Sequence, residues 1–325
     1  MATEGKITGE RQKRHSRYID MWVTPGLHPT NIDLLSKLKS AEDRQFSSNM
    51  GVTGKMIDED RQEKSKEESH IIGVRTDIWK PSKDDKKRVI TKIQKEREKE
   101  LRSRLKSDGR LNKSQKAVLD AKLDNDETMQ MDVSDVDKQR LVLKMFKSTG
   151  KRIRWKGTLE EMTVHEVHNS LGSHRPLITF AAILPDYDYM IHIQQNRRIF
   201  YIPPTFSFAY YEESNDRMWY IDLKCYWVSF GIDFKIEAQG RKIGKIDGKF
   251  WALGTDSRIH VHEPTLAKDQ KFMDLLSLFS ASIGFQKRIR QNIRMRVKKV
   301  KRGRSMHIIE DEELWLLKNP RRLVR

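Results

Sequence analysis

A segment that is apolar in nearly every direction around a helix limits the possible folds of this chain most. Residues 269–285 read DQKFMDLLSLFSASIGF, and a helix without a polar face must be buried on all its sides. The segment is too short to cross a bilayer, which takes about 20 apolar residues, and it contains Asp274. Because it follows a series of strand-like runs, the simplest arrangement is a buried helix threaded through a closed sheet.

The region before this helix predicts strands. Its short apolar runs are rich in aromatic and β-branched residues, and turn-forming residues separate them as in an all-β sandwich or barrel. Residues 232–237 alternate apolar and polar, as a half-buried strand does, and a hairpin turn signal follows at Ala238. The predicted strands cover residues 177–184, 189–193, 198–202, 206–211, 218–228, 232–237, 242–251 and 258–262.

Residues 1–150 differ in composition, because charged side chains dominate there and apolar ones are sparse. The whole chain has 64 Lys and Arg against 46 Asp and Glu, a formal net charge of +18, and only 37% hydrophobic residues. These values predict one packed domain with a long solvated remainder. The mixed-charge segment 58–69 is expected to be mobile unless a partner holds it. Helices are predicted at residues 31–39, 86–106, 112–123 and 135–147.

Several classes of site are not indicated by the sequence. Cys225 is the only cysteine, which excludes an intramolecular disulfide and a multi-cysteine zinc site. His165 and His168 stand one residue too close for the H-E-x-x-H zinc pattern, and His260 and His262 have no evident ligand partner. No nucleophile–base pair stands at a convincing spacing. We therefore predict no enzyme activity, no catalytic residue, no metal and no cofactor.

The expected location follows from two further features. No apolar run approaches bilayer length, and no apolar stretch follows the charged first residues as it would in a secretory signal. We expect a soluble protein of the cytoplasm, with the membrane periphery and the nucleus as alternatives.

The end of the strand region resembles a known superfamily. The stretch GIDFKIEAQGRKIGKIDGK at 231–249, the strand at Ile259 and the helix from Phe272 look like the end of a Tubby C-terminal-like domain. That superfamily includes the Tubby proteins, the LURP-one-related proteins and the phospholipid scramblases, and the resemblance covers residues 205–285 well and 150–285 loosely. It implies a twelve-stranded β-barrel around a central C-terminal helix.

The chain also departs from this superfamily. The strand region is short for twelve strands, so some strands would come from residues 152–155 or from the N-terminal half. The cysteine cluster of the scramblases is absent, and the chain continues past the helix to residue 325. The expected organisation is a charged, helical or disordered N-terminal region at 1–150, a mainly β, Tubby-like barrel at 151–285 with its helix at 270–285, and a basic extension at 286–325.

The densest charge feature follows the helix directly. Residues 286–304 read QKRIRQNIRMRVKKVKRGR and contain no acid, so they create a potential suited to phosphate groups. The partner would be anionic lipid head groups or a nucleic-acid backbone, and the run could also serve as a nuclear address. The candidate polyanion-binding residues are Lys287, Arg288, Arg290, Arg294, Arg296, Lys298, Lys299, Lys301, Arg302 and Arg304.

Aromatic residues near the end of the strand region allow two interpretations. They could stack nucleic-acid bases on a sheet surface, but core packing is the better prediction, and Cys225 among them is expected to be a buried structural thiol. These residues are Trp219, Tyr220, Tyr226, Trp227, Phe230 and Phe250.

Three functions remain open at this point. The first is a non-enzymatic Tubby-like binding or adaptor module that meets an anionic membrane surface or a protein partner. The second is a nucleic-acid- or ribonucleoprotein-associated protein, favoured by the charge of +18. The third is a structural component whose N-terminal helices run along a large protein assembly.

Overall fold

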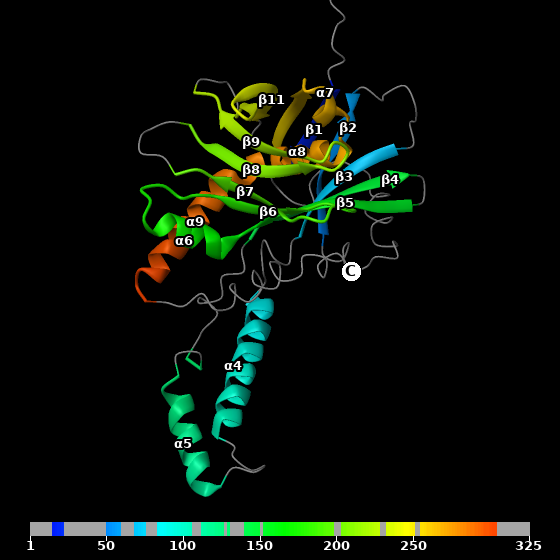
Figure 1. Cartoon of the computed structure of the whole chain (residues 1–325). Helices are drawn as coiled ribbons and strands as arrows, with labels where there is room; N and C mark the ends of the chain where they lie inside the picture. Colours follow the sequence, from blue (N-terminus) through cyan, green and yellow to red (C-terminus); the bar gives the residue numbers. More distant parts are fainter. Residues whose placement is uncertain are drawn as a thin grey trace, which may run out of the picture.

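The protein is mainly β, and its strands form one closed antiparallel barrel (Figure 1). The computed structural model describes residues 15–22, 50–59, 68–75, 83–105, 112–126, 129–130, 140–149, 152–197, 203–227, 232–250 and 254–303. These residues form twelve strands: β1 (His15–Trp22), β2 (Met50–Asp58), β3 (Glu68–Arg75), β4 (Val142–Thr149), β5 (Arg152–Glu161), β6 (Thr179–Ile183), β7 (Ile191–Gln195), β8 (Thr205–Glu212), β9 (Arg217–Cys225), β10 (Phe234–Ala238), β11 (Arg241–Phe250) and β12 (Gly254–Val261).

The strands lie around the barrel in chain order. Each strand pairs with its neighbours in the sequence, and β1 closes the sheet by pairing with β12, with Ile19 opposite Ser257. Closure leaves none of these strands at an open edge, where unpaired backbone groups would invite another chain. The predicted β-barrel is therefore confirmed.

The first half of the chain contributes more to the barrel than its composition predicts. Strands β1 to β4 all come from residues before 150, so the domain boundary expected at 151 falls inside the closed sheet. The helix predicted at 135–147 is wrong, because β4 occupies Val142–Thr149. The predictions for residues 31–39 and 198–202 lie outside the described residues, as does most of the mixed-charge segment 58–69.

The predicted buried helix is present as α8 (Gln270–Ser282). Its residues from Phe272 onward are buried, and it contacts strands on several sides of the barrel, including β1, β4, β5 and β12. The ring of Phe272 lies 5.1 Å from that of Tyr210 in β8, and the ring of Phe279 lies 5.1 Å from that of Phe206. The helix therefore forms the centre of the core, with aromatic contacts to the wall.

A helical pair is inserted between the paired strands β3 and β4. The helices are α4 (Lys83–Leu105) and α5 (Lys113–Asp124), which confirm the helices predicted at 86–106 and 112–123. Asn112 caps α5 with a reciprocal capping box. Arg97 of α4 donates to Asp126 at 2.9 Å, and Figure 1 shows both helices extending away from the barrel.

The two ends of the barrel carry different short helices. After β12 comes α7 (Pro264–Lys268), which leads into α8. At the other end of α8, the turn η2 (Ile283–Phe285) leads into α9 (Gln286–Val300), which packs on α6 (Thr163–Leu171). Among the helices that the structure describes, none combines the length and the apolar character that crossing a bilayer requires.

Candidate functional site

The basic run is a helix with two faces rather than an open extension. Ile289, Ile293 and Arg296 of α9 are buried, together with Gln286 and Asn292. The exposed cations of α9 and the turn after it fall within an arc of about 140° at 3.6 residues per turn. We call this set the α9 basic face; it consists of Lys287, Arg288, Arg294, Lys298, Lys301 and Arg302.

Arg296 belongs to the buried side of α9 and anchors it to the barrel. Only 1% of the side chain is exposed, and its Nη1 lies 2.7 Å from Glu161 Oε1 and 3.6 Å from Glu166 Oε2. Glu161 in turn accepts a hydrogen bond from the Leu141 backbone N–H at 2.8 Å. The guanidinium is therefore buried and paired with carboxylates of the protein itself. The prediction that Arg296 binds an external polyanion is wrong.

Glu166, one of the two carboxyls beneath α9, has a strongly shifted pKa. Burial raises the pKa of Glu166 well above its usual range, and the nearby Glu161 adds to this shift while Arg296 opposes it. Glu166 also accepts the Thr179 backbone N–H at 3.1 Å. Because both carboxyls are buried, they hold α9 in place and meet no external substrate.

Two more predicted cations are partly covered. Arg290 donates to Gln286 Oε1 at 3.2 Å, and burial lowers its pKa, with Arg294 and Arg175 adding to the shift. Lys299 is half-buried. Arg304, the last of the predicted set, lies outside the described residues.

A signal for this sorting is present in the sequence. Ile289, Ile293 and Val297 repeat every four residues through the run, which is the period of one helix face. Charge density alone does not distinguish the buried cations of the run from the exposed ones. The apolar repeat identifies which cations turn inward.

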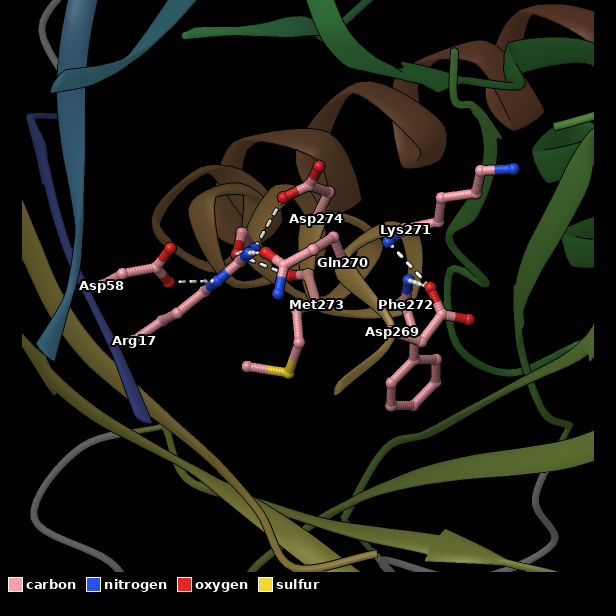
Figure 2. A network of polar contacts seen from close by, with 9 residues as sticks. Arg17, Asp58, Asp269, Gln270, Lys271, Phe272, Met273 and Asp274 are labelled. Atoms are coloured by element: carbon pink, nitrogen blue, oxygen red, sulfur yellow. Dashed lines mark hydrogen bonds and ion pairs between the residues drawn. The ribbon is translucent and has the colours of Figure 1, made fainter. Parts of the chain in front are cut away.

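A second buried polar network surrounds Arg17 at the opposite end of α8 (Figure 2). Arg17 of β1 donates to Asp58 at 2.6 Å, to Asp274 at 2.6 Å and to Gln270 at 2.6 Å. Burial raises the pKa of Asp274, and Arg17 opposes that shift. The acid within an otherwise apolar helix is therefore part of a structural tie between α8 and β1.

The aromatic residues near β9 do not all pack in the core. Trp219 is buried and donates to Glu212 at 2.8 Å, as core packing predicts. Tyr220 is 66% exposed and Trp227 is 68% exposed, so the prediction of core packing is wrong for both. Tyr220 lies on the outer side of β9, and Trp227 follows the end of that strand. Tyr226 is 38% exposed.

The remaining predictions for this region have mixed outcomes. Cys225 is partly buried rather than fully buried. Phe230 lies outside the described residues, and the side chain of Phe250 is likewise not described. His165 lies near His192, with ring centroids 6.2 Å apart, and the described part of the chain holds no group of three side chains suited to a metal.

Comparison of the chain with known protein families, curated proteins and solved structures found no match.

Proposed function

We propose that the protein is a non-enzymatic binding module that holds an anionic membrane surface against the α9 basic face. One observation carries the proposal: the run contains no acid, and α9 with the turn after it places six exposed cations on one side, while Ile289 and Ile293 turn inward. A helical face of one charge sign is suited to rows of phosphate groups. The Tubby-like resemblance fits a binding module, and membership of that superfamily stays a prediction.

An exposed apolar residue favours lipid as the partner. Met295 is 53% exposed and lies between Arg288 and Arg302 on the circumference of the helix. Helices that lie on membranes combine cations with apolar side chains that enter the boundary between head groups and acyl chains. Each cation near an anionic leaflet contributes about 1 kcal/mol, so six would give about 6 kcal/mol. Binding of this strength is reversible and sensitive to salt.

The fixed position of α9 on the barrel supports the proposal as well. The helix α9 follows α8 through η2, and Arg296 ties it to Glu161. A pre-formed face does not have to be ordered when it meets the membrane, so less of the interaction energy is lost.

Vesicle co-sedimentation tests this proposal. We expect the full chain to bind phosphatidylcholine vesicles that contain about 30% phosphatidylserine, and not vesicles of phosphatidylcholine alone. The variant Lys287→Gln, Arg294→Gln, Lys298→Gln, Arg302→Gln should bind at least about tenfold more weakly. The control Lys113→Gln, Lys116→Gln, Lys242→Gln, Lys249→Gln removes the same charge from exposed sites elsewhere. Equal loss in both variants would reduce the effect to net charge and overturn the proposal.

Nucleic-acid binding is the second candidate, and the exposure of Trp227 and Tyr226 favours it. Aromatic rings beside a basic surface can stack on the bases of a single strand. The same two charge variants, together with Trp227→Ala, should then be compared on single-stranded RNA. Tight RNA binding that depends on both α9 and Trp227, with no vesicle binding, would favour this candidate over lipid.

A further inference from the structure

The outer surface of the β8–β9 hairpin, together with Tyr189 from the segment before β7, carries a patch of exposed aromatic and apolar side chains. Tyr220 is 66% exposed, Tyr189 is 55% exposed and Met218 is 44% exposed. Met218 lies opposite Tyr211 across the strand pair, and Tyr220 lies opposite Ala209. We call Tyr189, Met218 and Tyr220 together the tyrosine surface. Exposed patches of this composition mark interaction sites, because tyrosine supplies a large contact area at low entropic cost.

The tyrosine surface is held in a fixed arrangement. The ring of Tyr189 meets that of Tyr211 edge-on, with centroids 5.5 Å apart. The Tyr187 hydroxyl accepts the Tyr211 N–H at 2.9 Å, and the Tyr211 hydroxyl donates to Asp216 at 2.7 Å. The rings of Tyr189 and Tyr211 are therefore oriented before any partner arrives, which lowers the cost of binding.

A cavity of about 540 Å³ opens beside this surface, where the β8–β9 turn meets α7 and the start of α8. Its lining includes the side chains of Tyr210, Glu213 and Asp269 and of two lysines, Lys268 and Lys271. Lys271 is paired with Glu213 at 2.5 Å, and Asp269 accepts the Tyr210 hydroxyl at 2.6 Å. The volume is ample for one long side chain of a partner.

Acidic side chains border the tyrosine surface, in contrast to the net charge of +18 of the chain. Asp186 and Asp188 precede its first tyrosine, and Glu213 and Asp216 lie in the β8–β9 turn. Four acids at this end outnumber the three nearby cations, Arg217, Lys268 and Lys271, so a partner with positive charge matches this surface best.

The chain itself displays the contact that such a partner would make. The guanidinium of Arg217 lies 3.8 Å from the centre of the Trp219 ring, and Lys271 Nζ lies 5.6 Å from the centre of the Tyr187 ring. Cations on aromatic rings contribute about 0.5–2 kcal/mol each. An arginine or lysine of a partner would find the same chemistry on Tyr189 and Tyr220.

We propose that the tyrosine surface docks a basic peptide segment of a partner protein. The side chains of its Arg or Lys residues lie on the rings of Tyr189 and Tyr220, and one cationic group reaches the cavity and shares the Glu213 carboxylate with Lys271. The site lies at the α7 end of the barrel, away from the α9 basic face. Tests of peptide docking and of membrane binding therefore have independent outcomes.

Fluorescence anisotropy of the full chain tests the docking proposal. The probe is a dye-labelled peptide of repeated Arg-Ser units, about 10 residues long, and its neutral counterpart has repeated Gln-Ser units. We expect the Arg-Ser peptide to bind and the Gln-Ser peptide not to. Tyr189→Ser, Tyr220→Ser and Glu213→Gln should each weaken binding at least about fivefold, as the loss of one good contact does.

Matched controls make the result decisive. Trp227→Ser removes an equally exposed aromatic from the other end of β9 and should leave peptide binding unchanged. The variant with four Gln substitutions in the α9 basic face should also retain peptide binding, whether or not it binds vesicles. Equal loss in Trp227→Ser and Tyr220→Ser, at unchanged melting temperatures, would overturn the proposal. A concentration-dependent dimer in sedimentation velocity that Tyr220→Ser abolishes would assign the surface to a second copy and overturn it too.

Discussion

Two buried arginines hold the interior of this protein together at the residue scale. Arg17 compensates Asp274 at one end of α8, and Arg296 compensates Glu161 beneath α9. Each has an exposed fraction of 2% or less. Replacement of a buried pair by apolar groups is often tolerated, whereas removal of one partner leaves an uncompensated charge.

We expect Arg296→Met to lower the free energy of unfolding by about 3–5 kcal/mol, because it leaves Glu161 buried without its cation. Adding Glu161→Gln should recover part of that loss. Arg294→Met, on the exposed side of the same helix, should cost less than about 0.5 kcal/mol. Urea unfolding of the three variants checks this. Equal stability of Arg296→Met and Arg294→Met would contradict an anchoring role.

His70 of β3 predicts how stability depends on pH. Burial is the main cause that lowers its pKa from 6.5 to about 4, and Arg17 adds to the effect. As pH falls below 6.5, His70 takes up a proton in the unfolded chain but stays neutral in the folded chain. The free energy of unfolding therefore declines until about pH 4. The loss reaches about 3 kcal/mol.

The replacement His70→Gln removes this titration and should flatten the fall in melting temperature between pH 6.5 and 4. His174→Gln, at an exposed site, serves as the control and should keep the wild-type slope. Parallel slopes for wild type and His70→Gln would refute the assignment.

At the scale of elements, some parts of the fold could be predicted and others could not, for physical reasons. The helix α8 is apolar all round, and β8 to β12 alternate or carry aromatic runs, so both patterns are visible locally. The sequence of β4 predicts a helix because Val142, Leu143, Met145 and Phe146 also fit a helical stripe. All four are buried, so both faces of this strand are covered and no alternation appears.

The candidate site divides in the same way. Charge density locates the run after residue 285, but only the helical period tells Arg296 from Arg294. The tyrosine surface could not be predicted, because which side of β9 faces out depends on barrel closure. Tyr220 and Trp219 are neighbours in sequence and have opposite exposure.

The role of α8 as the centre of the core gives a prediction for the same scale. Leu276 is fully buried, so Leu276→Asp places an unpaired carboxyl in the core and should prevent folding, at a cost of several kcal/mol. Val118→Asp, on the exposed side of α5, should leave the melting temperature within a few degrees of wild type. A soluble, cooperatively folded Leu276→Asp protein would show that α8 is not the core.

At the scale of the whole molecule, the barrel is assembled from both halves of the chain and interrupted by a helical insertion. A fragment of residues 152–303 lacks β1 to β4 and should not fold, because it leaves two long open edges. A chain in which residues 79–138 are replaced by a short Gly-Ser linker should keep the melting temperature, since β3 and β4 pair side by side. Circular dichroism and thermal melts of both proteins check this. A folded 152–303 fragment would contradict the twelve-stranded closure.

The barrel also separates two different surfaces. The α9 basic face lies at the end where α8 leads into α9, and the tyrosine surface lies toward the end where β12 leads into α7. Under the two proposals, a membrane and a basic partner would therefore bind at different ends of the barrel and would not compete.

One measurement tests the membrane proposal most directly. In a Cys225→Ser background, an environment-sensitive dye is placed at Met295→Cys on α9 and, separately, at Tyr220→Cys on β9. With phosphatidylserine vesicles, the proposal predicts a blue shift and brighter emission from the dye at Met295 and no change at Tyr220, because only the α9 basic face enters the interface. An unchanged signal at Met295, or an equal change at Tyr220, would contradict it.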